Sequence, residues 1–131
     1  MPLQTWAANA VVDGILVGST FPPYATFFGA CFSTTLTLAN SSTYTQEVTG
    51  GTYLRQDISA AFSDSANGAS ANDAAIEFTL MPATTVYTFG VVTSSSVGGS
   101  IVWQAAITTP KTIAAGDTLR FAIGAVTGTS T

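Results

Sequence analysis

The sequence has 131 residues, of which 47% are hydrophobic and only 8% charged, and its formal net charge is −4. This length is typical of one domain with its own core. With only three basic residues, the chain is poorly suited to bind nucleic acid. It also lacks the run of about 18 apolar residues that a transmembrane helix needs, so neither nucleic acid nor a membrane is expected as a partner. Because the chain has no His, it lacks the commonest general base. Because it has one Cys, it can form neither a structural zinc site nor an internal disulfide.

The first predicted element is a helix over residues 3–17. Apolar residues recur every three to four positions, as on one face of a helix, at Leu3, Trp6, Ala7, Ala10 and Val17. Gly18 fits the end of this helix, and Pro22-Pro23 prevent its continuation. The helix would either cover the open end of a sheet or serve as an anchoring arm. We expect residues 1–20 to form this helix or arm and residues 21–131 to form a β-sandwich, together a single domain.

The rest of the chain is predicted to be strands separated by turns rich in Gly, Asn and Ser. Aromatic-rich or alternating segments that are typical of half-buried strands cover residues 24–32, 33–38, 53–58, 75–80, 86–93, 100–107 and 118–126. This pattern predicts a mainly β fold, a β-sandwich or jelly-roll-like domain with one N-terminal α-helix. We expect a hairpin from Val91 to Ile101 and a mobile or partner-facing loop from Ser63 to Asn72.

The ionisable residues do not predict a catalytic site. The seven acids are scattered, without support for a glycosidase-like pair. Oxygen ligands for calcium are offered by Asp64, Asn67, Asn72 and Asp73, but their spacing is irregular and favours turn residues. Cys31 lies in an apolar run and is expected to be a buried thiol, because a catalytic thiolate needs a basic partner. We therefore expect no enzyme activity, no catalytic or metal-binding residues and no cofactor.

Four residues are candidates for an interface: Trp6, Tyr44, Arg55 and Arg120. Tyr44 lies in a loop rich in Thr and Ser and is the best candidate for an exposed aromatic, and Trp6 is a second aromatic that can stack on a sugar or a protein partner. Arg55 and Arg120 lie on the polar faces of predicted strands, and a buried or interfacial arginine must be paired. The acids available within the chain or across a subunit boundary are Glu47, Asp57, Glu77 and Asp117.

A series of short motifs runs in order through nearly the whole chain. They are Trp6, Asn9, Val12, Asp13, Gly18, Phe21 and Pro23; Glu47-Val48, Gly50-Gly51, Tyr53 and Arg55; Asn67-Gly68 and Ala75–Phe78; and Phe89-Gly90, Gly98-Gly99, Trp103, Ala106, Thr108–Thr112, Gly116–Leu119, Phe121 and Gly124-Ala125. In this order and spacing the sequence resembles a family of short phage proteins labelled tail fibre proteins. The sequence departs from the family at Thr88, where members often have a side chain with a polar ring. It departs again after Val126, where the last strand is shortened or lost.

The resemblance implies a virion structural protein on the exterior of the head or the tail. We expect a capsid decoration (cement) protein or a short fibre-type subunit that stabilises or decorates the particle through oligomeric contacts. A charge-poor surface of hydroxyl and methyl groups favours this role, because such a surface resists aggregation poorly unless it is covered. The expected partners are further copies of the chain, with a trimer favoured, and virion proteins such as major capsid or tail proteins. The alternative is a tail-tip receptor-binding module that recognises a host cell-surface glycan.

Overall fold

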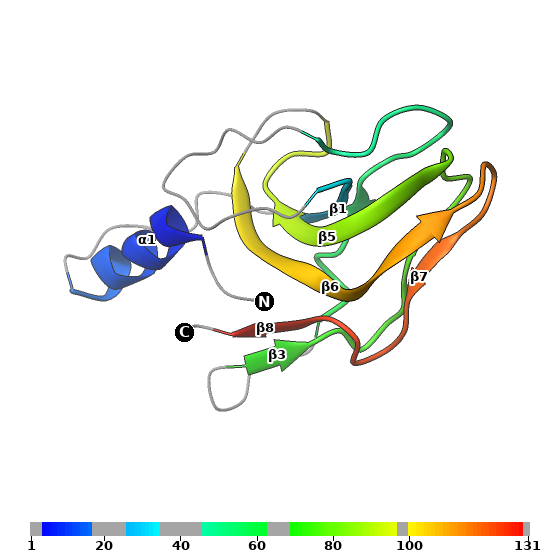
Figure 1. The fold of residues 1–131 in the computed structure, drawn as a ribbon. Coiled ribbons are helices and arrows are strands. Elements are labelled where there is room, and N and C mark those ends of the chain that lie inside the picture. The colour runs from blue at the N-terminus through cyan, green and yellow to red at the C-terminus, as the bar shows by residue number, and fades with distance from the viewer. Residues whose placement is uncertain (1–3, 17–25, 35–45, 63–68, 97–99, 130–131) are drawn as a thin grey trace.

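The computed structural model describes residues 4–16, 26–34, 46–62, 69–96 and 100–129. Within them, one helix is followed by eight strands (Figure 1). The bounds are Thr5–Leu16 for α1, Phe28–Phe32 for β1, Gln56–Asp57 for β2, Ala69–Ala71 for β3, Ile76–Phe78 for β4, Thr84–Val92 for β5, Ile101–Ile113 for β6, Leu119–Phe121 for β7 and Thr127–Thr129 for β8. The predicted mainly β, sandwich-like fold with a single N-terminal helix is confirmed.

One layer of the fold is a four-stranded antiparallel sheet with the order β2-β1-β5-β6. β5 and β6 form the predicted hairpin, in which Val91 pairs with Trp103 and Val92 with Ile101. β1 lies inside this sheet and pairs with both β2 and β5. Cys31, on β1, is completely buried, which confirms the prediction of a buried thiol. Most of the strand predicted over residues 33–38 lies outside the described residues.

Two small antiparallel sheets, β4-β7 and β3-β8, complete the sandwich. Phe78 of β4 and Leu119 of β7 share one buried cluster with Cys31 of β1 and Phe89 of β5, so the core lies between the layers. The pairing of β3 with β8 corrects the loop predicted from Ser63 to Asn72, because its residues 69–71 form a strand. Its residues 63–68 lie outside the described part of the chain. The last strand, β8, is present and short.

Strand β6 is longer than predicted and contains a wide bulge. Thr88 of β5 pairs with Ala106, whereas Val86 pairs with Lys111, so residues 107–110 of β6 face only Tyr87 on β5. A proline has no N–H to donate to the ladder and is tolerated at such irregularities, which explains Pro110 in this segment. The extra residues bend the strand and direct side chains away from the regular sheet.

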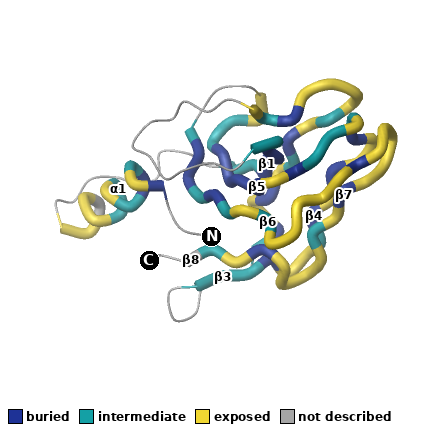
Figure 2. The backbone as a smooth tube through the Cα atoms, viewed as in Figure 1, coloured by how far each residue is buried: buried dark blue, intermediate teal, exposed yellow. Residues whose placement is uncertain are grey.

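Helix α1 is attached to the sheet at its N-terminal end and projects beyond it (Figure 1). The Gln4 backbone N–H donates to the Val102 carbonyl at 2.7 Å, and Ala7 is fully buried against Val102. Figure 2 shows the change from buried residues at this end to exposed residues at the far end. α1 therefore packs on its own domain at its base and resembles an arm at its tip. In the described chain, no helix is long and apolar enough to span a membrane.

Candidate functional site

A groove of about 650 Å³ lies between strand β6 and the segment that contains β7 and leads into β8. Its volume is within the range of small-ligand pockets. One wall is formed by residues 105–109 and Lys111 of β6, which include part of the bulge, and the other by residues 119–122 and 125–127, with Phe89 of β5 between them. The groove therefore lies between the edge strand β6 of the four-stranded sheet and the segment that contains β7.

The inner surface of the groove is aromatic. The rings of Phe89 and Phe121 both line it and have their centroids 4.9 Å apart. Phe78 lies beneath them in the core, with its ring centroid 6.4 Å from that of Phe89 and 6.3 Å from that of Phe121. Because these rings support one another, the shape of the groove depends directly on the packing of the core.

Lys111 and Arg120 are the charged residues in the groove lining, and both are basic. They are two of the three basic residues in a chain whose net charge is −4. Arg120 Nε donates to Glu77 Oε1 at 3.1 Å, and the two side chains are 56% and 48% exposed. Such an exposed pair contributes little to stability and leaves the arginine accessible to another acid. The groove lining therefore combines apolar side chains with two basic residues, and the acid Glu77 lies beside one of them.

Asn72 holds the outer wall of this groove in place. Its side-chain nitrogen donates to the carbonyls of Ala74 at 2.8 Å and Ala122 at 2.9 Å, and its side-chain oxygen accepts from the Val126 N–H at 2.9 Å. Asn72 is 1% exposed, so all three bonds are shielded from water. Sequence reasoning interpreted Asn72 as a turn residue, because nothing local indicates that it binds a segment 50 positions away.

Replacing Asn72 by alanine should lower the free energy of unfolding by about 2–3 kcal/mol, since it leaves buried backbone groups without a hydrogen-bond partner. Urea titration with fluorescence detection measures this loss. The matched control is Gln56→Ala, which removes an exposed amide bond to the Leu54 carbonyl. Equal stability of the two variants would contradict the role given to Asn72.

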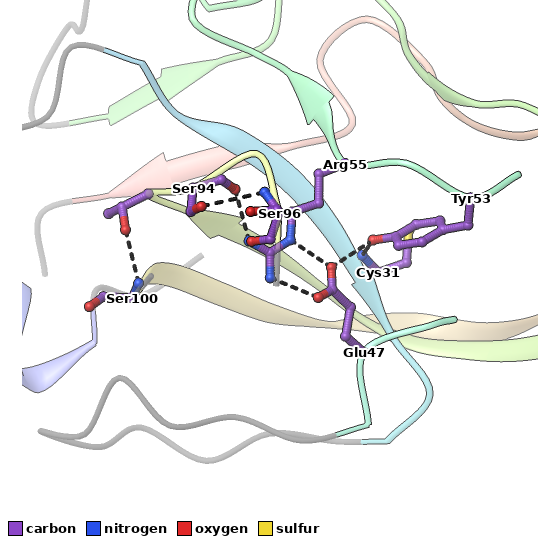
Figure 3. A network of polar contacts seen from close by, with 8 residues as sticks. Cys31, Glu47, Tyr53, Arg55, Ser94, Ser96 and Ser100 are labelled. Atoms are coloured by element: carbon purple, nitrogen blue, oxygen red, sulfur yellow. Dashed lines mark hydrogen bonds and ion pairs between the residues drawn. The ribbon is translucent and has the colours of Figure 1, made fainter. Parts of the chain in front are cut away.

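A second polar cluster is centred on Arg55 (Figure 3) and shares no residue with the groove lining. Arg55 Nε and Nη2 each donate to one oxygen of Glu47 at 2.7 Å, and Nη1 donates to the carbonyls of Ser94 and Ser96. The side chains of Arg55 and Glu47 are only 2% and 9% exposed. The ion pair is therefore buried and bidentate. Through its bonds to the Ser94 and Ser96 carbonyls, Arg55 also joins the segment before β2 to the end of the β5–β6 hairpin.

Tyr53 connects this ion pair to the central sheet. Its hydroxyl donates to Glu47 Oε1 at 3.2 Å and accepts from the Cys31 backbone N–H at 2.9 Å. Burial, followed by the proximity of Cys31 and Glu47, raises the pKa of Tyr53 far above its ordinary value. Burial and then Glu47 likewise raise the pKa of the Cys31 thiol. Both groups are therefore neutral in the native chain, which makes Cys31 a poor nucleophile.

The free energy of unfolding should fall as the pH rises above 9.0, the ordinary pKa of the Cys31 thiol. The native chain keeps protons on Cys31 and Tyr53 that the unfolded chain releases, so the unfolded state binds fewer protons at alkaline pH. The stabilisation is fully present below this pH. Urea midpoints measured between neutral and alkaline pH test the slope, which should be shallower in Cys31→Ala. A flat profile in the unmodified chain would contradict the assignment.

Three of the four predicted interface residues lie in the described part of the chain, and each has its own intramolecular partner. Trp6 lies at the base of α1, where its Nε1 donates to the Ile101 carbonyl at 2.7 Å. Arg55 is paired with Glu47 inside the chain, and Arg120 lines the groove beside Glu77. Tyr44 lies outside the described residues. Their predicted part in an interface stays a prediction, although Arg120 is the one placed at the groove.

The acidic residues of the described part of the chain are engaged in local contacts or lie apart from one another. Among the described residues, no group of three or more His, Cys, Asp or Glu residues is placed to hold a metal ion. Asp57 accepts hydrogen bonds from the hydroxyl and backbone N–H of Ser59, and these bonds hold its pKa below the usual value. Glu47 and Glu77 are each paired with an arginine. The groove is thus the candidate site, and its chemistry is that of apolar contact beside positive charge.

Comparison with known proteins gives one family. The family model described as Podophage GP4 fiber I protein gp80 matches residues 2–129 of the chain. The match spans the helix, both layers of the sandwich and the groove. No curated protein matches the sequence.

Proposed function

The chain belongs to the family described as Podophage GP4 fiber I protein gp80, and from this membership we propose that it is a non-enzymatic, short fibre-type subunit on the exterior of the phage particle. The observation on which the proposal depends is the match over residues 2–129, because it covers the fold as a whole. A phage fibre family indicates a virion structural protein. The position on the head or the tail, and the choice between a fibre and a capsid decoration, belong to the proposal.

The exposed surface supports a role in assembly. Large aliphatic side chains are exposed on α1, including Ile15 at 76% and Leu16 at 78%. Charged side chains that would keep such a surface soluble are few, at 8% of the sequence. Contacts with further copies or with another virion protein would remove these side chains from water. We propose a homotrimer, whose mass in solution would be about three times the 13.4 kDa of the chain.

A glycan-binding role at a tail tip is less well supported. Aromatic platforms for sugars need an accessible ring face. Among the described aromatic residues, Tyr87 is the exposed one, at 39%, whereas Trp6 and Trp103 are partly buried against the cluster of Ala7 and Val102. We expect purified chain not to bind host cells or their surface glycans. Specific binding that is lost in Tyr44→Ala, at the exposed aromatic predicted from the sequence, or in Tyr87→Ala would favour the receptor-binding role instead.

Cryo-electron microscopy of the particle tests the proposal. We expect density that fits the sandwich and α1 in an exterior fibre, present in several copies around a symmetry axis. Density on the capsid faces would indicate a decoration protein, and absence from the particle exterior would overturn the proposal. Incubation of the purified chain with host polysaccharide tests the absence of enzyme activity, because any release of reducing ends would contradict it.

A further inference from the structure

The tip of α1 presents an apolar patch with an acidic residue beside it. Val12, Ile15 and Leu16 are spaced three and four positions apart, so they share one face of the helix. They are 52%, 76% and 78% exposed. Asp13 is the one charged residue in the helix. An exposed patch of this kind favours burial against a partner that has apolar and basic groups.

The groove has the complementary composition. Its lining combines Phe121, Ile107 and several alanines with the basic residues Lys111 and Arg120, which outnumber the one acid beside them, Glu77. It lies along β6, the edge strand of the four-stranded sheet. The charge of the groove is therefore opposite to that of the helix tip, and its apolar surface matches the helix patch.

We propose that the tip of α1 from one copy docks in the groove of the next copy. Val12, Ile15 and Leu16 pack on the apolar lining, and Asp13 lies near Lys111 and Arg120. This is the helix-in-groove mode of recognition. The inference rests on the proposed function, since it supplies the contact by which fibre subunits assemble. Two different surfaces meet, so the contact is heterologous and forms a ring when the rotation closes.

The structure favours docking of the helix tip in the groove of a second copy over docking in its own groove or contact between two helix tips. The base of α1 is fixed to Val102 and Ile101 of its own chain, and its tip is exposed rather than placed in its own groove. Packing of α1 tips against one another would bring copies of Asp13 together without a basic residue on the helix. Like charges at such a contact would oppose it.

Cross-linking of single-cysteine variants tests the contact. Ile15→Cys and Ala122→Cys place thiols on the helix tip and in the groove, and Cys31 gives little background because it is fully buried. A short bis-maleimide should link the two variants when they are mixed and should link neither variant to itself. Self-linking of Ile15→Cys would overturn the inference in favour of contact between helix tips. Absence of the mixed product would also overturn it.

The matched control is Ala60→Cys, which is exposed in a turn and outside the groove, and it should not link to Ile15→Cys. Ile15→Ser should weaken self-association roughly 10- to 100-fold in sedimentation equilibrium, because the side chain loses its buried area. Its circular dichroism should be unchanged. A monomeric unmodified chain would overturn this contact and the proposed trimer, whereas the proposed place of the chain on the particle exterior is tested separately by cryo-electron microscopy.

Discussion

Replacing Glu47 by alanine should lower the free energy of unfolding by about 3–5 kcal/mol. The Arg55 side chain is only 2% exposed, so the substitution leaves a buried guanidinium that has lost its carboxylate partner. Arg55 keeps its bonds to the carbonyls of Ser94 and Ser96, but these are neutral acceptors. Urea denaturation followed by tryptophan fluorescence measures the loss as a shift in the midpoint at constant slope.

The chain provides its own control for this prediction. Glu77 and Arg120 form the same type of ion pair, but their side chains are 48% and 56% exposed. Glu77→Ala should therefore change the stability by about 0–1 kcal/mol. Similar losses in Glu47→Ala and Glu77→Ala would show that burial does not determine the effect. Glu47→Leu combined with Arg55→Met should recover part of the loss, because an apolar pair has no charge to desolvate.

The strands that the sequence predicts correctly are those with strong local alternation. β5 and β6 alternate apolar and polar residues on either side of a polar loop, so their hairpin could be expected from sequence. β3 and β8 consist of small residues, Ala69-Ser70-Ala71 and Thr127-Gly128-Thr129, with little alternation. Their pairing joins parts of the chain that are distant in sequence. Such a pairing cannot be predicted from local periodicity.

The polar cluster around Arg55 and the groove were both harder to predict than the fold. Glu47 was one of four acids available to Arg55, and the choice depends on contacts that only the folded chain makes. The groove depends on the bulge in β6, whereas the sequence predicted the strand to end at residue 107. Thr108, Thr109 and Pro110 do not alternate, so periodicity is lost where the strand bends.

Replacing Phe78 by alanine should lower the free energy of unfolding by about 3–5 kcal/mol, because it leaves a cavity in the core. Phe78 is 1% exposed, and its ring contacts those of Tyr53, Phe89 and Phe121. Urea denaturation measures the loss. It should exceed that of Leu54→Ala, which removes a side chain that is 70% exposed and should change stability by about 0.5 kcal/mol or less.

The same substitution should also weaken assembly, since Phe89 and Phe121 form the inner surface of the groove and lose the ring beneath them. Self-association of Phe78→Ala, measured by sedimentation equilibrium under conditions where the chain remains folded, should therefore fall together with its stability. Leu54→Ala should leave both quantities nearly unchanged. Full association of a folded but destabilised Phe78→Ala would show that the groove keeps its shape without core support, and the link between core packing and the groove would then be wrong.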